Sequence, residues 1–176
     1  EAAKEAMQWH VEFRGIQPAV EKRGRYAQYY LARGEIEELL EDWCRAEWIL
    51  KRRARIGTIS EVKFHPTARE RKDISPPIRT FLRQKSARPH RILYHGMGKD
   101  QVGLTALSGR APTIGYDPHH PDPEKRQLPA GRFDELHSHY VLNTVKPDEG
   151  QEILAEIYTL LTSEGRAVIS VRRDLG

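Results

Sequence analysis

Hydrophobic and polar positions follow two different patterns along the chain. Up to about residue 55, apolar residues recur at helical spacing, over residues 27–31 and 36–51, and this predicts two or three helices. After Pro89, short apolar runs alternate with stretches of helical spacing, which predicts a mostly parallel sheet with helices on its faces. The predicted strands are residues 91–94, 113–116, 135–142 and 166–171, and the predicted helices are residues 102–107 and 148–161.

The stretch between these two parts carries weaker signals. Residues 58–64 alternate like a short strand or an extended arm, and Ser75-Pro76-Pro77 opens a predicted helix through Gln84. We therefore expect an N-terminal helical region over residues 1–56, a basic linker or arm over residues 57–90 and an α/β domain over residues 91–176.

Charge is segregated along the chain, although the net charge is only +4. Residues 45–91 contain 14 Lys and Arg against 4 Asp and Glu, whereas residues 1–44 contain 6 against 9 and residues 92–176 contain 9 against 12. A basic segment with aromatic residues in it predicts contact with a polyanion such as RNA or DNA. The alternative is a solvated helix face followed by a charged linker. The predicted polyanion contacts are Arg52, Arg53, Arg55, Arg69, Arg71 and Lys72.

Composition argues against several classes of protein. No apolar run approaches the roughly 18 residues that cross a bilayer, and no charged-then-apolar leader comes first, so we expect a soluble, cytoplasmic protein without membrane contact. The single cysteine, Cys44, excludes an internal disulfide and a thiolate-rich zinc site. The chain opens on helix-forming residues without Met, and we expect it to begin inside a longer protein.

One segment carries the pattern of a nucleoside site. The apolar run of residues 91–94 enters a turn with Gly96 and Gly98, and a second apolar run ends at Asp117, nineteen residues after Gly98. Glycines at such a turn let backbone N–H groups approach a ligand, and a carboxylate at the end of the next strand accepts hydrogen bonds from ribose hydroxyls. The sequence therefore predicts that an α/β domain binds a nucleoside cofactor here.

Four segments, in this order, resemble the class I S-adenosylmethionine-dependent methyltransferases: Ile92-Leu-Tyr-His-Gly-Met-Gly98, Gly115-Tyr-Asp-Pro118, Tyr140-Val-Leu-Asn143 and Leu160-Leu-Thr-Ser-Glu-Gly-Arg-Ala-Val-Ile-Ser170. The chain also resembles a group of bacterial proteins assigned as methyltransferases associated with DNA phosphorothioation, including at Thr67-Ala-Arg-Glu-Arg71 and Ile74-Ser-Pro-Pro77. The resemblance covers about residues 64–173. It implies a Rossmann-like methyltransferase sheet that binds S-adenosylmethionine across the carboxyl ends of its strands.

The resemblance also implies roles for individual residues. Gly96 and Gly98 would lie under the methionine part of the cofactor, and Asp117 would bind its ribose, with Tyr116 beside it. The family has a third glycine where this chain has Asp100. Asp100 either takes over a contact with the cofactor's amino group or crowds the loop.

The sheet is expected to be trimmed or incomplete. Only residues 121–133 separate the second and third predicted strands, which is too short for a helix, a strand and a second helix. The chain also stops where the family adds two more strands. Three explanations are open: a fragment, a reduced fold, or a larger assembly in which a partner chain completes the sheet.

The predicted catalytic residues follow the third strand. Methyl transfer needs a nucleophile held in line with the sulfonium methyl group, and a base where the nucleophile carries a proton. His139, Tyr140 and Asn143 are placed for these roles, and the alternative is that they are buried polar residues at the sheet edge. The Asp/Asn-Pro-Pro-aromatic and Pro-Cys signatures of DNA base methyltransferases are absent, which disfavours that class.

Two other functions stay open beside an active methyltransferase, which we rank first. A catalytically inactive, methyltransferase-like subunit that binds nucleic acid or a protein would account for the missing third glycine and the basic segment. A His-rich metal-dependent hydrolase ranks last, although a His-x-His pair on a strand places both imidazoles on one face. Its ligands would come from His119, His120, Asp122, His137 and His139.

Overall fold

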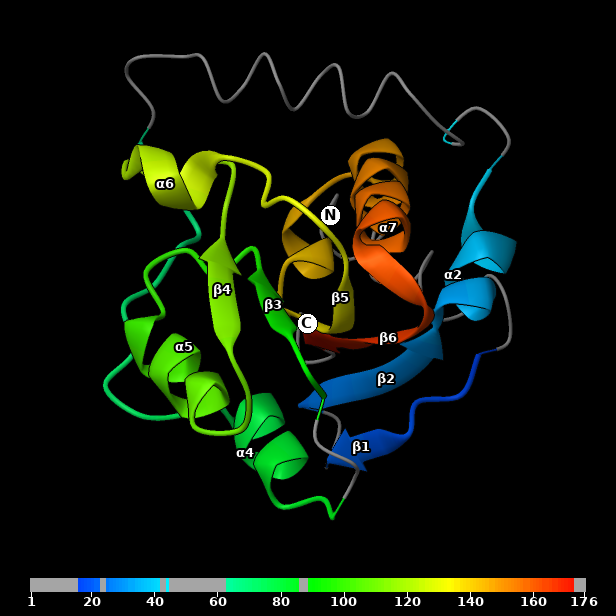
Figure 1. Ribbon diagram of the computed structural model, residues 1–176, viewed down its shortest axis with the longest axis horizontal. Helices are drawn as coiled ribbons and strands as arrows, with labels where there is room; N and C mark the ends of the chain where they lie inside the picture. Colours follow the sequence, from blue (N-terminus) through cyan, green and yellow to red (C-terminus); the bar gives the residue numbers. More distant parts are fainter. Residues whose placement is uncertain (1–15, 23–24, 42–43, 45–62, 86–88, 173–176) are drawn as a thin grey trace.

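Six strands form one sheet in the described part of the chain, which comprises residues 16–22, 25–41, 44, 63–85 and 89–172 of the computed structural model. The sheet order is β1-β2-β6-β5-β3-β4 (Figure 1). In chain order the elements are β1 Val20–Lys22, β2 Tyr26–Ala32, α2 Arg33–Leu39, α4 Pro76–Leu82, β3 Ile92–His95, α5 Gln101–Ser108, β4 Thr113–Tyr116, α6 Pro123–Arg126, β5 Phe133–His139, the 3-10 helix η2 Leu142–Thr144, α7 Pro147–Leu160 and β6 Leu161–Arg172.

The four C-terminal strands are parallel, since β4 pairs with β3, β3 with β5 and β5 with β6. Every strand and helix predicted after Pro89 is present. The main differences are that β6 begins at Leu161 and that β5 ends at His139. The strand ends there because the next residue, Tyr140, has a left-handed backbone conformation with φ 62°. The fold is therefore mixed α/β, as the alternating pattern predicts.

The N-terminal part contains strands, whereas the sequence predicted only helices there. Residues 27–31 lie in strand β2, which pairs with β6 in antiparallel register, with Ala27 opposite Val171 and Leu31 opposite Ala167. Over so few residues, a strand that is buried on both faces gives the same run of apolar positions as a buried helix. The helix predicted from residue 36 is confirmed in part by α2, and its continuation past residue 44 lies outside the described residues.

Strands β1 and β2 change the expected extent of the sheet. The prediction left the edge of the last strand open, whereas β2 pairs along this edge of β6 and β1 pairs with β2. The expected boundary at residue 56 therefore does not separate a helical region from the sheet, and the edge of β6 needs no partner chain. At the other end only α6 lies between β4 and β5, as the short sequence between them predicts, and β4 is an edge strand of the described sheet.

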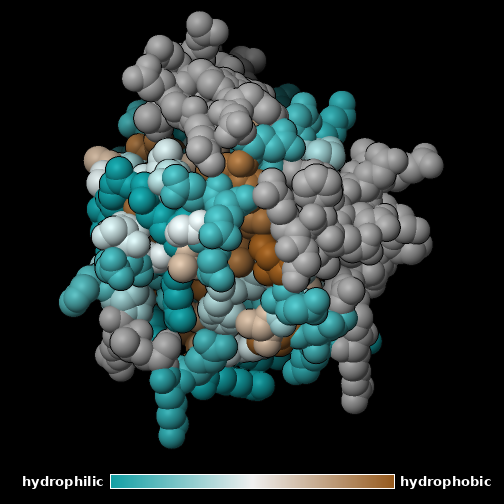
Figure 2. Space-filling view, turned by 90° about the vertical axis from the view of Figure 1, so that its right-hand side faces the viewer, coloured by the Kyte–Doolittle hydropathy of each residue, from teal (hydrophilic) through white to brown (hydrophobic). Residues whose placement is uncertain are grey.

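Helices cover both faces of the sheet (Figure 1). The larger core lies between the sheet, α2 and α7 and includes Leu136, Ile157 and Ile169, and the smaller core lies under α4 and α5 and includes Phe81 and Val168. Seen from the side that carries α2, the described surface is mostly hydrophilic with a strip of hydrophobic residues along its middle (Figure 2). Among the described helices, none combines the length and the apolar content that crossing a membrane requires.

Candidate functional site

Three parallel strands end side by side at one edge of the sheet. From β3 the chain leads through α5 to β4 on one side, whereas β5 lies on the other side of β3. The strand order therefore reverses at β3, and open α/β sheets bind ligands outside the strand ends at such a point. The residues that follow β3, β4 and β5 are Gly96 to Gly98, Asp117 and Tyr140. We call this region the carboxyl edge.

The turn after β3 has the conformation that its glycines predict. Gly96 and Gly98 have φ 65° and 53°, in the left-handed region that favours glycine. The N–H groups of Gly96 and Met97 donate to the backbone oxygen of Tyr116 over 2.7 and 3.3 Å. A Cβ atom at Gly96 would lie 2.5 Å from a methyl carbon of Val141, so this position also needs glycine for space. Tyr116, a predicted cofactor residue, thus supports the turn through its backbone while its side chain is buried.

Asp117 connects the turn to the second strand. Its Oδ2 accepts a hydrogen bond from the Gly98 N–H over 2.8 Å, and its Oδ1 accepts one from the His119 N–H over 2.7 Å. The residue is 7% exposed. An ionised carboxylate oxygen can accept more than one hydrogen bond.

Asp100 closes the turn instead of facing an open site. Its Oδ1 accepts the Gly103 N–H over 2.8 Å and caps α5, and its Oδ2 accepts the Tyr94 hydroxyl over 2.7 Å. Burial and the neighbouring Asp100 carboxylate hold the pKa of Tyr94 well above its usual value. The Arg71 Nε atom lies 3.6 Å from the same Oδ2. Asp100 therefore uses its hydrogen-bonding capacity inside the protein.

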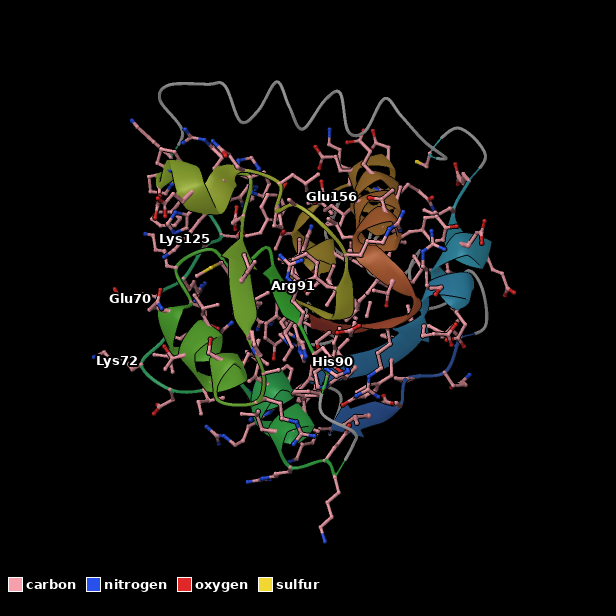
Figure 3. All side chains as sticks on the ribbon, in the orientation of Figure 1. Glu70, Lys72, His90, Arg91, Lys125 and Glu156 are labelled. Atoms are coloured by element: carbon pink, nitrogen blue, oxygen red, sulfur yellow. The ribbon has the colours of Figure 1, made fainter. Side chains whose placement is uncertain are left out.

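A segment that the sequence placed in a linker packs against the carboxyl edge. We call residues 63–73 the crossing segment. A Cβ atom at Gly98 would lie 3.1 Å from the Cβ atom of Ala68, and the Arg71 guanidinium lies 5.4 Å from the centre of the Tyr140 ring. Glu70 and Lys72 point outward, away from the sheet (Figure 3). No periodic pattern in this segment could have revealed its contacts.

Tyr140 is the one residue other than glycine that has a positive φ among the described residues. Its N–H donates to the backbone oxygen of Ser170 over 2.7 Å, which joins the ends of β5 and β6. A left-handed conformation costs a residue with a Cβ atom about 1–2 kcal/mol, so the surrounding contacts must hold it. Such strained residues concentrate at functional sites.

A chain of buried hydrogen bonds runs along β5 toward the carboxyl edge. Glu135 Oε1 lies 2.8 Å from His137 Nε2, His137 Nδ1 lies 3.1 Å from His139 Nε2, and His139 Nδ1 lies 3.0 Å from Ser170 Oγ. At the other end, the Arg166 Nε–H donates to Glu135 Oε2 over 2.9 Å. We call these residues the buried chain. Alternating polar residues on a central strand were a signal for it, because buried polar groups need partners.

The environment sets the charges in the buried chain. Burial lowers the pKa of His137, and it lowers the pKa of His139 further, with the neighbouring His137 and Arg71 acting in the same direction. Burial alone would raise the pKa of Glu135, but the hydrogen bonds from His137 and Arg166 lower it below its usual value. At neutral pH the buried chain therefore holds one carboxylate, that of Glu135, and two neutral imidazoles, those of His137 and His139.

Two further polar groups near the strand ends have internal partners. Asn143, a predicted catalytic residue, is buried in η2, and its Oδ1 accepts the Arg172 N–H over 3.4 Å at the end of β6. On the α7 face, His95 Nε2 lies 2.6 Å from Glu156 Oε1, and both side chains are buried. Neither arrangement brings a polar group into an open site.

The predicted nucleic-acid contacts divide into three groups. Arg69 and Lys72 are exposed in the crossing segment, whereas Arg71 faces Asp100 and Tyr140. The other predicted contacts, Arg52, Arg53 and Arg55, lie outside the described residues.

The residues of the metal hypothesis lie in two places. The rings of His137 and His139 are hydrogen-bonded to each other inside the sheet. The His119 ring packs instead against the crossing segment, with its centre 5.3 Å from that of the His65 ring. The centre of the His120 ring lies 4.8 Å from that of the Phe64 ring. Within the described ranges, no group of three or more His, Cys, Asp or Glu side chains has an arrangement that could hold a metal ion.

We compared the chain with protein-family models, with curated proteins and with solved structures, and none of them matches it.

Proposed function

We propose that this chain is a class I S-adenosylmethionine-dependent methyltransferase that binds its cofactor at the carboxyl edge. The observation that carries the proposal is the pairing of a left-handed glycine turn with an acid at the point where the strand order reverses. Gly96 and Gly98 form the turn, and Asp117 is joined to it by the hydrogen bond from Gly98. This is the place and the chemistry that nucleoside binding in α/β folds requires.

The residues fit a nucleoside cofactor, provided that the crossing segment moves. A carboxylate oxygen can accept more than one hydrogen bond, so the two Asp117 oxygens suit the two hydroxyls of a ribose. Because Ala68 packs against Gly98, a ligand that approaches this glycine has to displace the segment. Movement of a surface segment over a ligand is common in enzymes.

The sheet supports the same proposal. Its four parallel strands and covering helices are compatible with a Rossmann-like methyltransferase. The resemblance implies two strands beyond β6, and in the sheet of this chain β2 and then β1 lie beyond β6. They would take the place of these strands from the N-terminal side.

S-Adenosylmethionine supplies an electrophilic methyl group on a sulfonium centre. The protein then has to orient a nucleophile, exclude water and accept a proton. Tyr140 lies at the end of β5 and faces Arg71, so it suits the orienting role. His139 does not suit a direct role as base, because both its ring nitrogens already have partners in the buried chain.

Calorimetric titration with S-adenosylmethionine and S-adenosylhomocysteine tests the proposal. We expect micromolar binding to the full chain and a loss of at least tenfold in Asp117→Ala, with Glu124→Ala as the matched control on the exposed surface of α6. Thermal unfolding of each variant verifies that it is folded. Failure of the folded wild-type chain to bind, or equal binding by Asp117→Ala, would overturn the proposal.

A second candidate function is an inactive methyltransferase-like subunit that binds nucleic acid. The specific observation in its favour is that internal groups fill the turn, with Ala68 against Gly98 and with Asp100 bonded to Tyr94. Binding of single-stranded RNA or DNA by a chain that fails to bind either cofactor form would favour this function. For an active enzyme we propose the same class of substrate, because Arg69 and Lys72 are exposed beside the carboxyl edge.

A further inference from the structure

Each hydrogen bond of the buried chain has a defined donor and a defined acceptor. Arg166 donates to Glu135 and holds it as a carboxylate, which can only accept, so His137 must donate its Nε2 proton to Glu135. His137 Nδ1 is then an acceptor, and His139 donates its Nε2 proton to it. His139 Nδ1 accepts in turn, so the Ser170 hydroxyl is the donor at the end of the chain.

Protonation of Glu135 would reverse this order. A carboxylic acid donates to His137 Nε2, and each imidazole then donates from Nδ1 to the next member. Ser170 Oγ would become an acceptor at its end. The reversed state holds one proton more than the first: a proton is added at Ser170, Glu135 becomes a carboxylic acid, and both imidazoles stay neutral.

The Ser170 end of the buried chain adjoins a buried polar atom that has no hydrogen-bond partner among the described residues. Gln28 lies directly opposite Ser170 on β2, a position at which Cβ atoms are about 4.5–5.5 Å apart. Its Nε2 donates to the Pro77 oxygen over 3.3 Å, but its buried Oε1 has no hydrogen-bond partner among the described residues. A buried acceptor without a partner is costly, so Gln28 Oε1 suits a further N–H or O–H donor.

We propose that Glu135, His137, His139 and Ser170 form a proton relay that takes a proton from a nucleophile at the carboxyl edge. Ser170 is the group that receives the proton, and Glu135 is the final acceptor. His137 and His139 are positioning residues that conduct it. The identity of the proton donor rests on the methyltransferase function proposed above, whereas the direction of the relay rests on the contacts alone.

The relay step balances its protons. The N–H or O–H bond of the nucleophile breaks, and its proton bonds to Ser170 Oγ as the hydroxyl proton moves to His139 Nδ1. The His139 Nε2 proton moves to His137 Nδ1, and the His137 Nε2 proton moves to Glu135 Oε1. The electron pair of the broken bond stays on the nucleophile, both imidazoles stay neutral, and Glu135 becomes a carboxylic acid.

The surroundings favour return to the starting state. The Arg166 guanidinium contacts Glu135 and is one third exposed, and its positive charge favours the return of Glu135 to the carboxylate. Arg71 acts on His139 from the crossing segment and opposes a positive charge on its ring. The other close rings are uncharged: Phe81 of α4 lies 4.4 Å from the His137 ring, and Tyr94 of β3 lies 6.0 Å from the His139 ring.

Long-range proton–nitrogen NMR spectra of the full chain with labelled histidine test the relay without any cofactor. At pH 7.5 we expect His137 and His139 to be neutral and protonated at Nε2. In Glu135→Gln the side-chain amide donates to His137, so both rings should change to the Nδ1-protonated form. The matched control, Glu164→Gln on the exposed part of β6, should leave both rings unchanged.

The decisive signal is His139, because it does not contact residue 135. An isolated structural pair of His137 with Glu135 would not change the tautomer of His139 at a distance. A mixed or cationic His139 in the wild type, or an unchanged His139 in a folded Glu135→Gln, would overturn the relay.

If Glu135→Gln does not fold, Ser170→Ala provides the test. We expect at least tenfold slower exchange of the His139 ring proton with solvent, and an unchanged rate would overturn the relay. These spectra need no S-adenosylmethionine. A failed calorimetric titration would therefore overturn the proposed function but not the direction of the hydrogen bonds in the buried chain.

Discussion

The Asp117 carboxylate accepts the Gly98 N–H over 2.8 Å, and this hydrogen bond ties the turn after β3 to the end of β4. Asp117→Ala removes the acceptor of two backbone N–H groups, those of Gly98 and His119. We expect the free energy of unfolding to fall by about 1–3 kcal/mol, because donors are left unsatisfied near the core. Urea denaturation measures this change. The free energy of unfolding of Glu124→Ala, on the exposed face of α6, should stay within about 0.5 kcal/mol of wild type. An equal loss in both variants would contradict the stabilising role of the Asp117 hydrogen bonds.

The buried chain predicts that acid destabilises the protein. His137 and His139 have lowered pKa values in the folded protein, so between pH 6.5 and those values the unfolded chain binds more protons. The free energy of unfolding should therefore fall as pH decreases below about 6.5, by up to about 1.4 kcal/mol per pH unit for each histidine. The lowered pKa of Glu135 adds a further loss below pH 4.5, its ordinary value.

Denaturation at several pH values measures this dependence. His139→Gln should reduce the slope between pH 6.5 and 5, whereas His90→Gln, at an exposed position, should leave it unchanged. If the free energy of unfolding has the same pH dependence in wild type, His139→Gln and His90→Gln, the buried histidines do not titrate as described.

Gly96 and Gly34 should respond in opposite directions to substitution by alanine. Gly96 has φ 65° and no room beside Val141, so we expect Gly96→Ala to lower the free energy of unfolding by more than about 2 kcal/mol. Gly34 lies in α2 with nothing within 4 Å of an added Cβ atom, and Gly34→Ala should be stabilising by up to about 1 kcal/mol. Addition of Val141→Ala should recover part of the loss at Gly96. Equal effects of the two glycine substitutions in thermal unfolding would contradict the geometry of the turn.

Tyr140 should tolerate glycine better than alanine. Both substitutions remove the ring that faces Arg71, but only glycine relieves the φ of 62°. We expect Tyr140→Gly to have a larger free energy of unfolding than Tyr140→Ala by about 1 kcal/mol. The order of the two midpoints in urea checks this, and the reverse order would mean that the left-handed conformation is absent in solution.

Binding of single-stranded nucleic acid should depend steeply on salt. Release of counterions from the phosphates gives a slope of about −0.7 per neutralised charge for single strands. The double variant of Arg69→Ala and Lys72→Ala should reduce the magnitude of the slope by about 1.4, whereas Lys22→Ala on β1 should not change it. Fluorescence anisotropy at several salt concentrations measures the slope, and a flat dependence in wild type would exclude the crossing segment as a phosphate contact.

Sequence analysis predicted the glycine turn and Asp117 because both follow apolar runs that are neighbours in the chain and in the sheet. It could not predict β2, because the burial of that strand depends on pairing between Ala27 and Val171, which are far apart in sequence. The contacts of Ala68 and Arg71 were missed because an irregular segment carries no hydrophobic period.

The sequence predicted only part of the buried chain. The alternation of Glu135, His137 and His139 places the three side chains on one face of a strand. The partners that turn these side chains into a directed chain, Arg166 and Ser170, come from β6 and depend on its register with β5. The same residue types were therefore interpreted as catalytic or metal-binding groups.

The central claim is that a nucleoside cofactor binds where β3, β4 and β5 end. Backbone amide NMR spectra of the full chain, recorded during titration with S-adenosylhomocysteine, test it most directly. We predict that the largest shifts fall on Gly96, Gly98, Asp117 and on Ala68 of the crossing segment, which has to move. The absence of shifts at millimolar ligand, or shifts confined to residues away from the carboxyl edge, would contradict the account.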